Sequence, residues 1–283
     1  MVKRFGWGQL VFAIALALFL IVIFFPFYWM LISSTKNLQE LFGPAPTFWP
    51  SRFTFDAYQE LFGRLHFLNN FKISFLVATA TAVLAVIMSA LGAYAVARLH
   101  FRGKNLLLNT VLLVYLFPGV LLIIPLFAML SQAGQQLGLE IQNNLPVLIL
   151  TYLAQTLPVA LYMLASYFRT VPEEIEEAGL IDGCTRLGVV WRITLPLSIP
   201  AMVSVGIYTF MIAWNEFLYA YVFLNRREIF TLPIRLMNIS SQMNTRWDVV
   251  MAASTVMTIP IIVLFLVFER FLEEGLVAGG VKG

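Results

Sequence analysis

The sequence predicts an all-α membrane protein, and three observations support this fold class. Charged residues make up 12% of the 283 residues, against about 25% in soluble domains. Hydrophobic residues make up 60%, which is more apolar surface than a soluble fold of this size can bury. Several apolar stretches are as long as the roughly 20 residues that a helix needs to cross a bilayer. Lipid cannot satisfy exposed backbone groups and the alternation of a membrane β-strand is absent, so these stretches are predicted to be helices.

The composition also excludes several other classes of protein. The chain contains 25 Phe, 10 Tyr and 6 Trp, which excludes a disordered or collagen-like chain. The single cysteine, Cys184, excludes an intrachain disulfide framework and a cysteine-based metal cluster. The histidines His66 and His100 are far apart in the sequence, so no metal site is expected. The small net charge of +3 gives no indication of a nucleic-acid partner.

The first predicted span, residues 11–32, follows a basic N-terminus that is similar to the start of a signal peptide. The apolar run is too long for a signal peptide and no A-x-A cleavage site follows it, so a retained anchor is expected. Prolines inside the spans predict kinks, because neighbouring groups in a membrane satisfy the freed carbonyls. The other predicted spans are 73–97, 106–130, 145–168, 197–224 and 249–268.

Only the fifth span contains a charged residue, Glu216. If the helix begins near Leu197, a rise of about 1.5 Å per residue places Glu216 roughly 28 Å along it, close to the outer surface. A charge costs little there, so a role in an outer gate is favoured over solute binding.

Lys and Arg near the span ends predict the orientation, because they favour the cytoplasmic side. The basic N-terminus and the link with Arg98, Arg102 and Lys104 are placed inside, whereas the link 131–144 has neither Lys nor Arg. The last outer loop carries several arginines, so the excess of Lys and Arg on the predicted cytoplasmic side is small. Six spans place both termini in the cytoplasm.

The outer segment 33–72, rich in aromatic residues and turn formers, is predicted to form a short irregular cap. Residues 1–283 are predicted to form a single domain.

The link between the fourth and fifth spans, called the polar link (residues 169–196), carries the densest charge cluster of the chain. Thr170 and Glu173 have the spacing of a capping box, and Pro172 suits a first helical turn, so a helix is predicted to begin there. Carboxylates cover most of its surface. One side of this helix is apolar and carries Ile175, Ala178 and Ile181.

A turn and a second short helix are predicted to complete the polar link. Asp182-Gly183 is a turn signal, and Gly183 can adopt the left-handed conformation that ends a helix. Thr185 is predicted to cap the second helix, and Pro196 to end it. These patterns alone support two interpretations of the polar link equally well. It is either a solvated helix pair without a partner or an element that docks on another protein. The apolar stripe of the second helix is Leu187, Val190, Trp191 and Leu195.

Three segments of the polar link resemble the EAA loop of permeases from ATP-binding-cassette (ABC) importers. The family pattern is EAA, three residues, G, nine residues, I-x-L-P. This chain has Glu177-Ala178-Gly179, Gly183 and Ile193-Thr194-Leu195-Pro196 at the same spacing. Gly179 replaces the usual second alanine, which loosens a helix by about 1 kcal/mol.

The resemblance extends over the whole chain. The tail 275–283 and the segment Trp214-Asn215-Glu216-Phe217 are similar to those of the smaller permease of maltose-type carbohydrate importers. The resemblance implies a six-transmembrane-helix ABC importer permease bundle with a cytoplasmic coupling helix. It further implies that this helix docks on an ATPase subunit, where Glu177 pairs with a basic group. The coupling residues implied are Glu176, Glu177, Ala178, Gly179, Asp182, Gly183, Leu195 and Pro196.

The tail is expected to reach the interface between ATPase subunits through Gly279, Gly280 and Lys282, with a frayed terminus as the alternative. The partners implied are a second permease subunit, two copies of a cytoplasmic ATPase, an extracytoplasmic sugar-binding protein and membrane lipid. The expected location is the inner membrane of a bacterium or archaeon. No cofactor and no catalytic role are expected, because the sequence has no Walker A loop.

The expected function is the import of sugars, such as maltodextrin or a galacto-oligosaccharide, and the sugar assignment comes from the resemblance. An importer of a non-sugar solute and an ion-coupled carrier are the alternatives, although a carrier would need buried carboxylates near the midplane. A membrane enzyme would need a nucleophile-base or metal constellation. Interhelical hydrogen bonds explain the polar residues of the spans equally well. The candidates for a translocation path are Tyr115, Gln155, Tyr208, Asn215 and Glu216.

Overall fold

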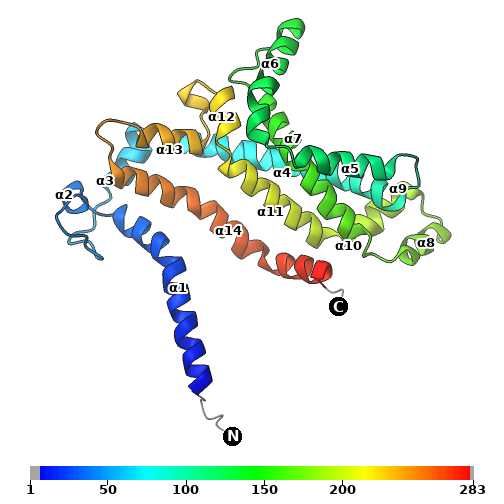
Figure 1. Ribbon diagram of the computed structural model, residues 1–283, viewed down its shortest axis with the longest axis horizontal. Coiled ribbons are helices and arrows are strands. Elements are labelled where there is room, and N and C mark those ends of the chain that lie inside the picture. Colours follow the sequence, from blue (N-terminus) through cyan, green and yellow to red (C-terminus); the bar gives the residue numbers. More distant parts are fainter. Residues whose placement is uncertain (1–6, 281–283) are drawn as a thin grey trace. The chain divides into compact units, whose positions relative to one another are not determined.

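The computed structural model describes the backbone of residues 7–280 and the side chains of residues 7–271. Helices are the only regular secondary structure in this part of the chain (Figure 1). The contacts divide the chain into two compact units, and each unit is described by itself. Unit 1 is the chain up to Leu68 together with Leu236–Pro260. Unit 2 is Asn69–Arg235 together with the chain from Ile261 on.

Five of the described helices are long and apolar enough to cross a membrane. A sixth crossing results when the pair Arg186–Leu197 and Ile199–Asn215, which is bent by 74° at its break, is taken as one span. The predicted all-α membrane fold is thus confirmed. The five helices are α1 (Trp7–Ser33), α4 (Phe67–Arg98), α6 (Gly119–Leu137), α7 (Leu145–Phe168) and the stretch Trp247–Phe271 of α14 (Trp247–Gly280).

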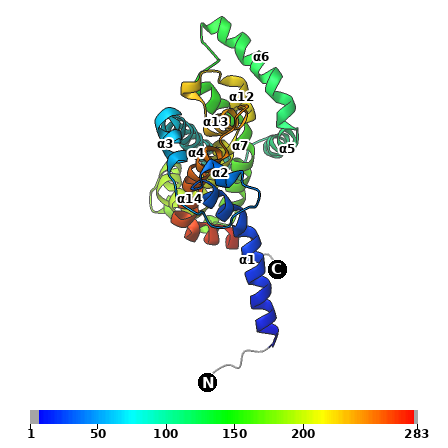
Figure 2. The same cartoon turned by 90° about the vertical axis from the view of Figure 1, so that its left-hand side faces the viewer.

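The third predicted span is not the continuous helix expected over 106–130. It is divided into α5 (Lys104–Tyr115) and α6, which run in different directions (Figure 2). Pro118 lies at the interruption with an extended ψ of 107°. Proline lacks the N–H that a continuing helix needs and disfavours the helical conformation of the residue before it. Here the proline ends one helix instead of kinking it.

The fifth predicted span, 197–224, is also interrupted. It contains the end of α10 (Leu195–Leu197), then α11 (Ile199–Asn215) and α12 (Leu218–Phe223). Ser198 separates the first two, with φ −102° and ψ 8°. Glu216 has an extended backbone, with φ −68° and ψ 127°, and ends α11. The break at Glu216 places a charged residue between two helices, where its carboxylate can bind free backbone N–H groups.

The core of unit 2 forms where α4, α7 and α11 pack together (Figure 1). Small side chains dominate this core, and they let helix backbones approach closely, which is the usual basis of helix packing in membranes. The packing holds the C-terminal ends of α4 and α7 beside the start of α11. The buried residues of this core are Ala90, Ala93, Val96, Ala160, Leu164, Ala165, Phe168, Ala201 and Val205.

Asparagine and serine side chains at the start of α4 hold the loop that follows α12. Asn70 Nδ2 donates to the carbonyl oxygens of Arg227 and Phe230, at 3.0 and 2.9 Å. Ser74 Oγ accepts the backbone N–H of Leu232 at 2.6 Å. The loop contains the 3₁₀ turn η3 (Arg227–Ile229) and leads into α13 (Leu232–Ser240).

The cap after α1, in unit 1, is irregular as predicted. It contains α2 (Leu38–Leu41), α3 (Asp56–Gln59) and the π-helical turn η1 (Glu60–Arg64). Glu40 accepts hydrogen bonds from Thr47 Oγ1 at 2.7 Å and from Ser51 Oγ at 2.8 Å, and these bonds lower the pKa of its carboxyl group. Lys36 donates to the carbonyl oxygen of Thr47 and lies 4.6 Å from the ring centroid of Trp29. The segment 36–51 is therefore held by contacts among its own side chains and by contacts with side chains at the end of α1.

Candidate coupling and translocation site

The polar link folds into the helix-turn-helix that its sequence predicts. It contains α8 (Glu173–Ile181), a turn, α9 (Arg186–Val189), the π-helical turn η2 (Val190–Thr194) and the beginning of α10. Gly183 has a φ of +87°, the left-handed conformation predicted for the end of the first helix. Thr185 Oγ1 accepts the N–H of Gly188 at 3.1 Å and caps α9, also as predicted.

Two details of this prediction are wrong. The capping box does not form, because Thr170 Oγ1 donates to the carbonyl oxygen of Tyr167 at 2.7 Å and Pro172 is the N-cap of α8. Pro196 does not end the second helix but lies within α10, and the interruption comes at Ser198. Proline is tolerated in a first helical turn, because its missing N–H would have no partner there.

The buried side of α8 carries a charged residue, Glu176, which is only 7% exposed. Its Oε1 accepts hydrogen bonds from Arg98 Nε at 3.0 Å and from Thr194 Oγ1 at 3.1 Å. Arg98 also donates to the carbonyl oxygen of Val171 at 2.6 Å, and lies 3.5 Å from Glu173 Oε1. These bonds join α8 to the end of α4 and to η2. The predicted coupling set included Glu176, but this geometry gives it an internal role.

Gly179 lies on the same buried side and allows a close approach. A Cβ atom added to Gly179 would lie 2.4 Å from Cδ1 of Ile193 and 3.5 Å from Cγ2 of Val189. Ile193 thus fills the space that the alanine of the family pattern would need. The departure from the EAA pattern has a steric reason that the sequence alone did not indicate.

The outer side of the polar link exposes acidic and apolar side chains together. Glu177, Ala178 and Asp182 are exposed, as is Pro196, while Leu195 is half-buried. The stripe predicted on the first helix faces outward, and α8 packs through Glu176 and Gly179 instead. Half-buried Cys184 lies in the turn. Three large apolar side chains are more than half exposed, namely Ile181 (86%), Leu187 (72%) and Trp191 (62%).

The predicted tail is largely helical. α14 continues through Gly279 and Gly280, whereas Lys282 lies outside the described residues. The proposed contact of these residues with an ATPase stays a prediction.

The two interrupted spans meet at their breaks. Glu216 Oε1 accepts the N–H of Tyr219 at 2.9 Å and Oε2 accepts the N–H of Ala220 at 3.1 Å. The carboxylate therefore provides acceptors for two free backbone N–H groups in the first turn of α12. The Tyr219 hydroxyl donates to the carbonyl oxygen of Gly119, next to the break at Pro118, at 3.2 Å. The buried Tyr152 side chain of α7 lies near Glu216, although its hydroxyl group makes no hydrogen bond to the described residues. The carboxylate therefore lies where α6, α7 and α12 converge.

The other candidates for a translocation path are only partly brought together. Tyr115, at the end of α5, interacts with Tyr208 of α11. Asn215 donates to the carbonyl oxygen of Met211 in its own helix at 2.9 Å. Among the described residues, no hydrogen bond joins half-buried Gln155 of α7 to the other candidates.

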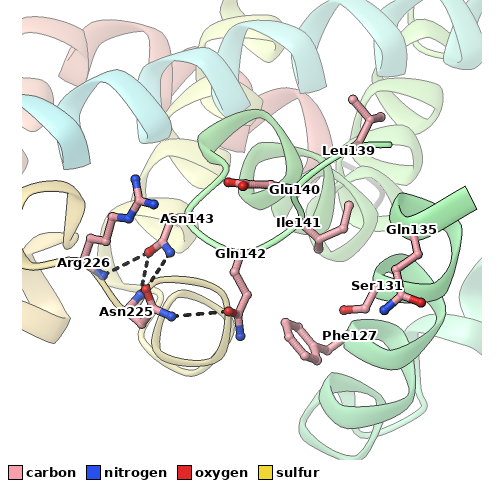
Figure 3. A pocket seen from close by; sticks show the side chains of 10 residues that line it. All are labelled: Phe127, Ser131, Gln135, Leu139, Glu140, Ile141, Gln142, Asn143, Asn225 and Arg226. Carbon is pink, nitrogen blue, oxygen red and sulfur yellow. Dashed lines mark hydrogen bonds between the residues drawn. The ribbon is translucent and has the colours of Figure 1, made fainter. Parts of the chain in front are cut away.

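The structure also shows a contact between two loops that the sequence did not predict, which we call the amide cluster (Gln142, Asn143 and Asn225). Asn143 has a φ of +58°, and its Oδ1 accepts the N–H groups of Asn225 and Arg226 at 2.8 and 3.0 Å (Figure 3). Its Nδ2 donates to Asn225 Oδ1 at 2.5 Å. The next residue, Asn144, caps α7 by accepting the N–H of Val147 at 3.2 Å. The order Asn-Asn-Leu-Pro is typical of a helix start and indicates this cap, but it gives no sign of the contact with Asn225.

Comparison with known proteins identifies the family. Residues 82–277 match the family described as "Binding-protein-dependent transport system inner membrane component". The chain is 42% identical to the "Inner membrane ABC transporter permease protein YcjP" of Escherichia coli (strain K12) over 95% of this chain and 94% of that protein. It is 34% identical to the "Trehalose/maltose transport system permease protein MalG" of Thermococcus litoralis over 93% of each.

A solved structure has the same fold. A chain in the crystal structure of a bacterial ABC transporter involved in the import of the acidic polysaccharide alginate superposes with a TM-score of 0.78 at 20% identity, and covers 96% of this chain and 100% of that one. The family match covers more than half of the chain and agrees with its multi-pass helical architecture. The chain therefore belongs to the inner membrane components of binding-protein-dependent transport systems, the permease subunits of ABC importers.

Proposed function

We propose that this permease takes up sugars, with oligosaccharides as the substrate class, and works as one of a pair of membrane subunits. The printed names of the relatives support sugars, since one moves trehalose and maltose and the solved transporter moves alginate. An extracytoplasmic binding protein delivers the sugar, and two copies of a cytoplasmic ATPase hydrolyse ATP. The permease itself is not catalytic.

The polar link couples ATP hydrolysis to transport in this proposal. The observation that carries it is that α8 exposes Glu177 and Ile181 on one side while Arg98 and Glu176 join its other side to α4. A helix fixed in this way transmits a displacement to the bundle, which a loose loop would absorb. The exposed carboxylates suit a basic docking surface. The polar link and both termini lie in the cytoplasm, in agreement with Arg98, Arg102 and Lys104 near the same membrane face.

The meeting point of the two broken spans forms an outer gate. Glu216 holds the first turn of α12, and Tyr219 joins α12 to the start of α6. A shift of α7 or α11 would move both contacts. We assign Tyr115, Tyr208 and Asn215 to the walls of the path beneath this gate.

Charge reversal at Glu177 tests the coupling role. Because Glu177 is exposed, Glu177→Arg is expected to leave the fold intact while it lowers sugar uptake and ATPase copurification by about tenfold or more, a change of roughly 1.4 kcal/mol or above. Glu174→Arg, an exposed residue of the same helix outside the coupling set, is the matched control. Equal complex yield and uptake in the two variants would remove Glu177 from the interface.

The energy source is tested by inactivating the partner ATPase in membrane vesicles. Uptake of sugar should stop. Uptake that continues on a proton or sodium gradient would favour the ion-coupled carrier. Transport of amino acids or ions in place of every sugar tried would reject the substrate class alone.

A further inference from the structure

A polar hollow of about 690 Å³ lies beside the amide cluster, entirely within unit 2 (Figure 3). Its volume is within the range of small-molecule sites, about 300 to 1,000 Å³. One wall is α6 and the opposite wall is the loop that leads to α7, together with the loop after α12. The lining residues are Phe127, Ser131, Gln135, Leu139, Glu140, Ile141, Gln142, Asn143, Asn225 and Arg226.

The wall from α6 is a regular stripe. Phe127, Ser131 and Gln135 follow one another at four-residue steps, so they share one face of the helix and point across the hollow (Figure 3). Phe127 is half-buried and packs edge-to-face on Phe223, with ring centroids 5.2 Å apart. The aromatic ring is therefore fixed at one end of the stripe, and the hydroxyl and amide groups follow it.

Several polar groups of the hollow have hydrogen-bonding capacity left. In the described part of the chain, the Ser131 hydroxyl and the Gln135 amide make no hydrogen bond. Gln142 uses its Oε1 to accept from Asn225 Nδ2 at 3.3 Å, which leaves its Nε2 to donate. An amide offers donors and an acceptor side by side, which suits neighbouring hydroxyl groups that both donate and accept. Glu140 and Arg226 contribute one charge of each sign.

We propose that this hollow binds a ring of a neutral carbohydrate, with an apolar ring face on Phe127 and its hydroxyl groups on Ser131, Gln135 and Gln142. The balanced charges favour a neutral sugar over an acidic one. This inference rests on the proposed sugar transport and on the proposed topology, by which the loops 138–144 and 224–227 face outward. The hollow then provides a weak site for sugar between the binding protein and the gate at Glu216.

Saturation-transfer NMR tests the site directly. The full-length chain, assembled with its partner permease and ATPase subunits in lipid nanodiscs, is mixed with trehalose or maltotriose at millimolar concentration and without ATP. The wild type is expected to transfer saturation to at least one of these sugars. Gln135→Leu should weaken that binding about threefold to tenfold, the effect of one neutral hydrogen bond. Gln132→Leu, an exposed residue on the same helix that does not line the hollow, is the matched control and should bind like the wild type.

Uptake measurements separate this inference from the proposed function. Gln135→Leu is expected to raise KM for the transported sugar about threefold to tenfold with kcat within about twofold, because the chemistry of ATP hydrolysis lies elsewhere. If the wild type transports sugar and Gln135→Leu matches Gln132→Leu in binding and in KM, the site is wrong and the function stands. If Gln135→Leu weakens docking of the sugar-free binding protein, the hollow is a protein contact and the proposal is overturned. If the wild type transports no sugar, the proposed function fails, whatever the NMR shows.

Discussion

Two regions of unit 2, the polar link and the amide cluster, are held by contacts of opposite kinds. The polar link is held by Arg98 and Glu176, whose side chains are 7% and 9% exposed, whereas Asn143 and Asn225 join the loops before α7 and after α12 through neutral groups that are exposed to water. A charge withdrawn from water must stay paired, but an exposed amide can exchange its partner for water. The polar link is therefore expected to respond strongly to the loss of one side chain, and the loops joined by the amide cluster weakly.

Removal of the arginine should have the largest effect. Arg98→Met leaves Glu176 buried without its cation, which is expected to destabilise the packing of α8 by about 3 to 5 kcal/mol. Hydrogen exchange of the α8 amides and the thermal unfolding midpoint in detergent measure this loss. Arg102→Met, an exposed arginine of the next loop, is the control and should change little.

A double variant separates charge burial from packing. Arg98→Met combined with Glu176→Gln removes both charges, so more than half of the lost protection in α8 should return. If the double variant is as unstable as Arg98→Met alone, the arginine acts through its packing and its bond to Val171, and the comparison between charged and neutral contacts no longer holds.

Gly183 tests whether the turn of the polar link depends on backbone conformation. Its φ is +87° and a Cβ there would meet no atom within 4 Å, so strain alone opposes a side chain. Gly183→Val should cost about 1 to 3 kcal/mol and lower transport. Gly183→Asn should retain most of the stability, because asparagine tolerates the left-handed region. Full transport and an unchanged unfolding midpoint in Gly183→Val would show that the turn adopts another conformation in the membrane.

The amide cluster should show the smallest effect. Asn143→Ala removes the acceptor of the Asn225 and Arg226 N–H groups and places a Cβ-bearing residue without a polar side chain at φ +58°. We expect a loss of about 1 to 2 kcal/mol, measured as faster hydrogen exchange of these two amides. Asn143→Gly removes the same acceptor without the strain and should lose less. Unchanged exchange in both variants would mean that other contacts hold these two loops.

The regular parts of the fold could be predicted from the sequence because their signals are local. The apolar run over 145–168 coincides with α7, and Gly183 ends α8 in the predicted conformation. The breaks at Pro118, Ser198 and Glu216 are exceptions. Proline inside a span is compatible with a kink or with an end, and the choice depends on which neighbours satisfy the freed carbonyls.

The contacts inside the candidate site could not be predicted, because they join residues far apart in the sequence. The sequence uses Arg98 only to indicate orientation, and the family resemblance places Glu176 beside Glu177 in the coupling set. Nothing local distinguishes Glu176 from Glu177, since adjacent positions of a helix differ only in the neighbour that each one faces. The contact between Asn143 and Asn225 could not be predicted for the same reason, because Asn143 precedes α7 and Asn225 follows α12.

The contact between Gly179 and Ile193 sets a condition on exchanging this element between relatives. A chimaera that receives only residues 173–183 from a permease with alanine at this position would bring a methyl group against the host isoleucine. Transfer of the complete segment 169–198 would carry both halves of the contact and keep the fit. Chimaeric permeases intended to work with a foreign ATPase should therefore be joined within α7 and α11, outside the polar link.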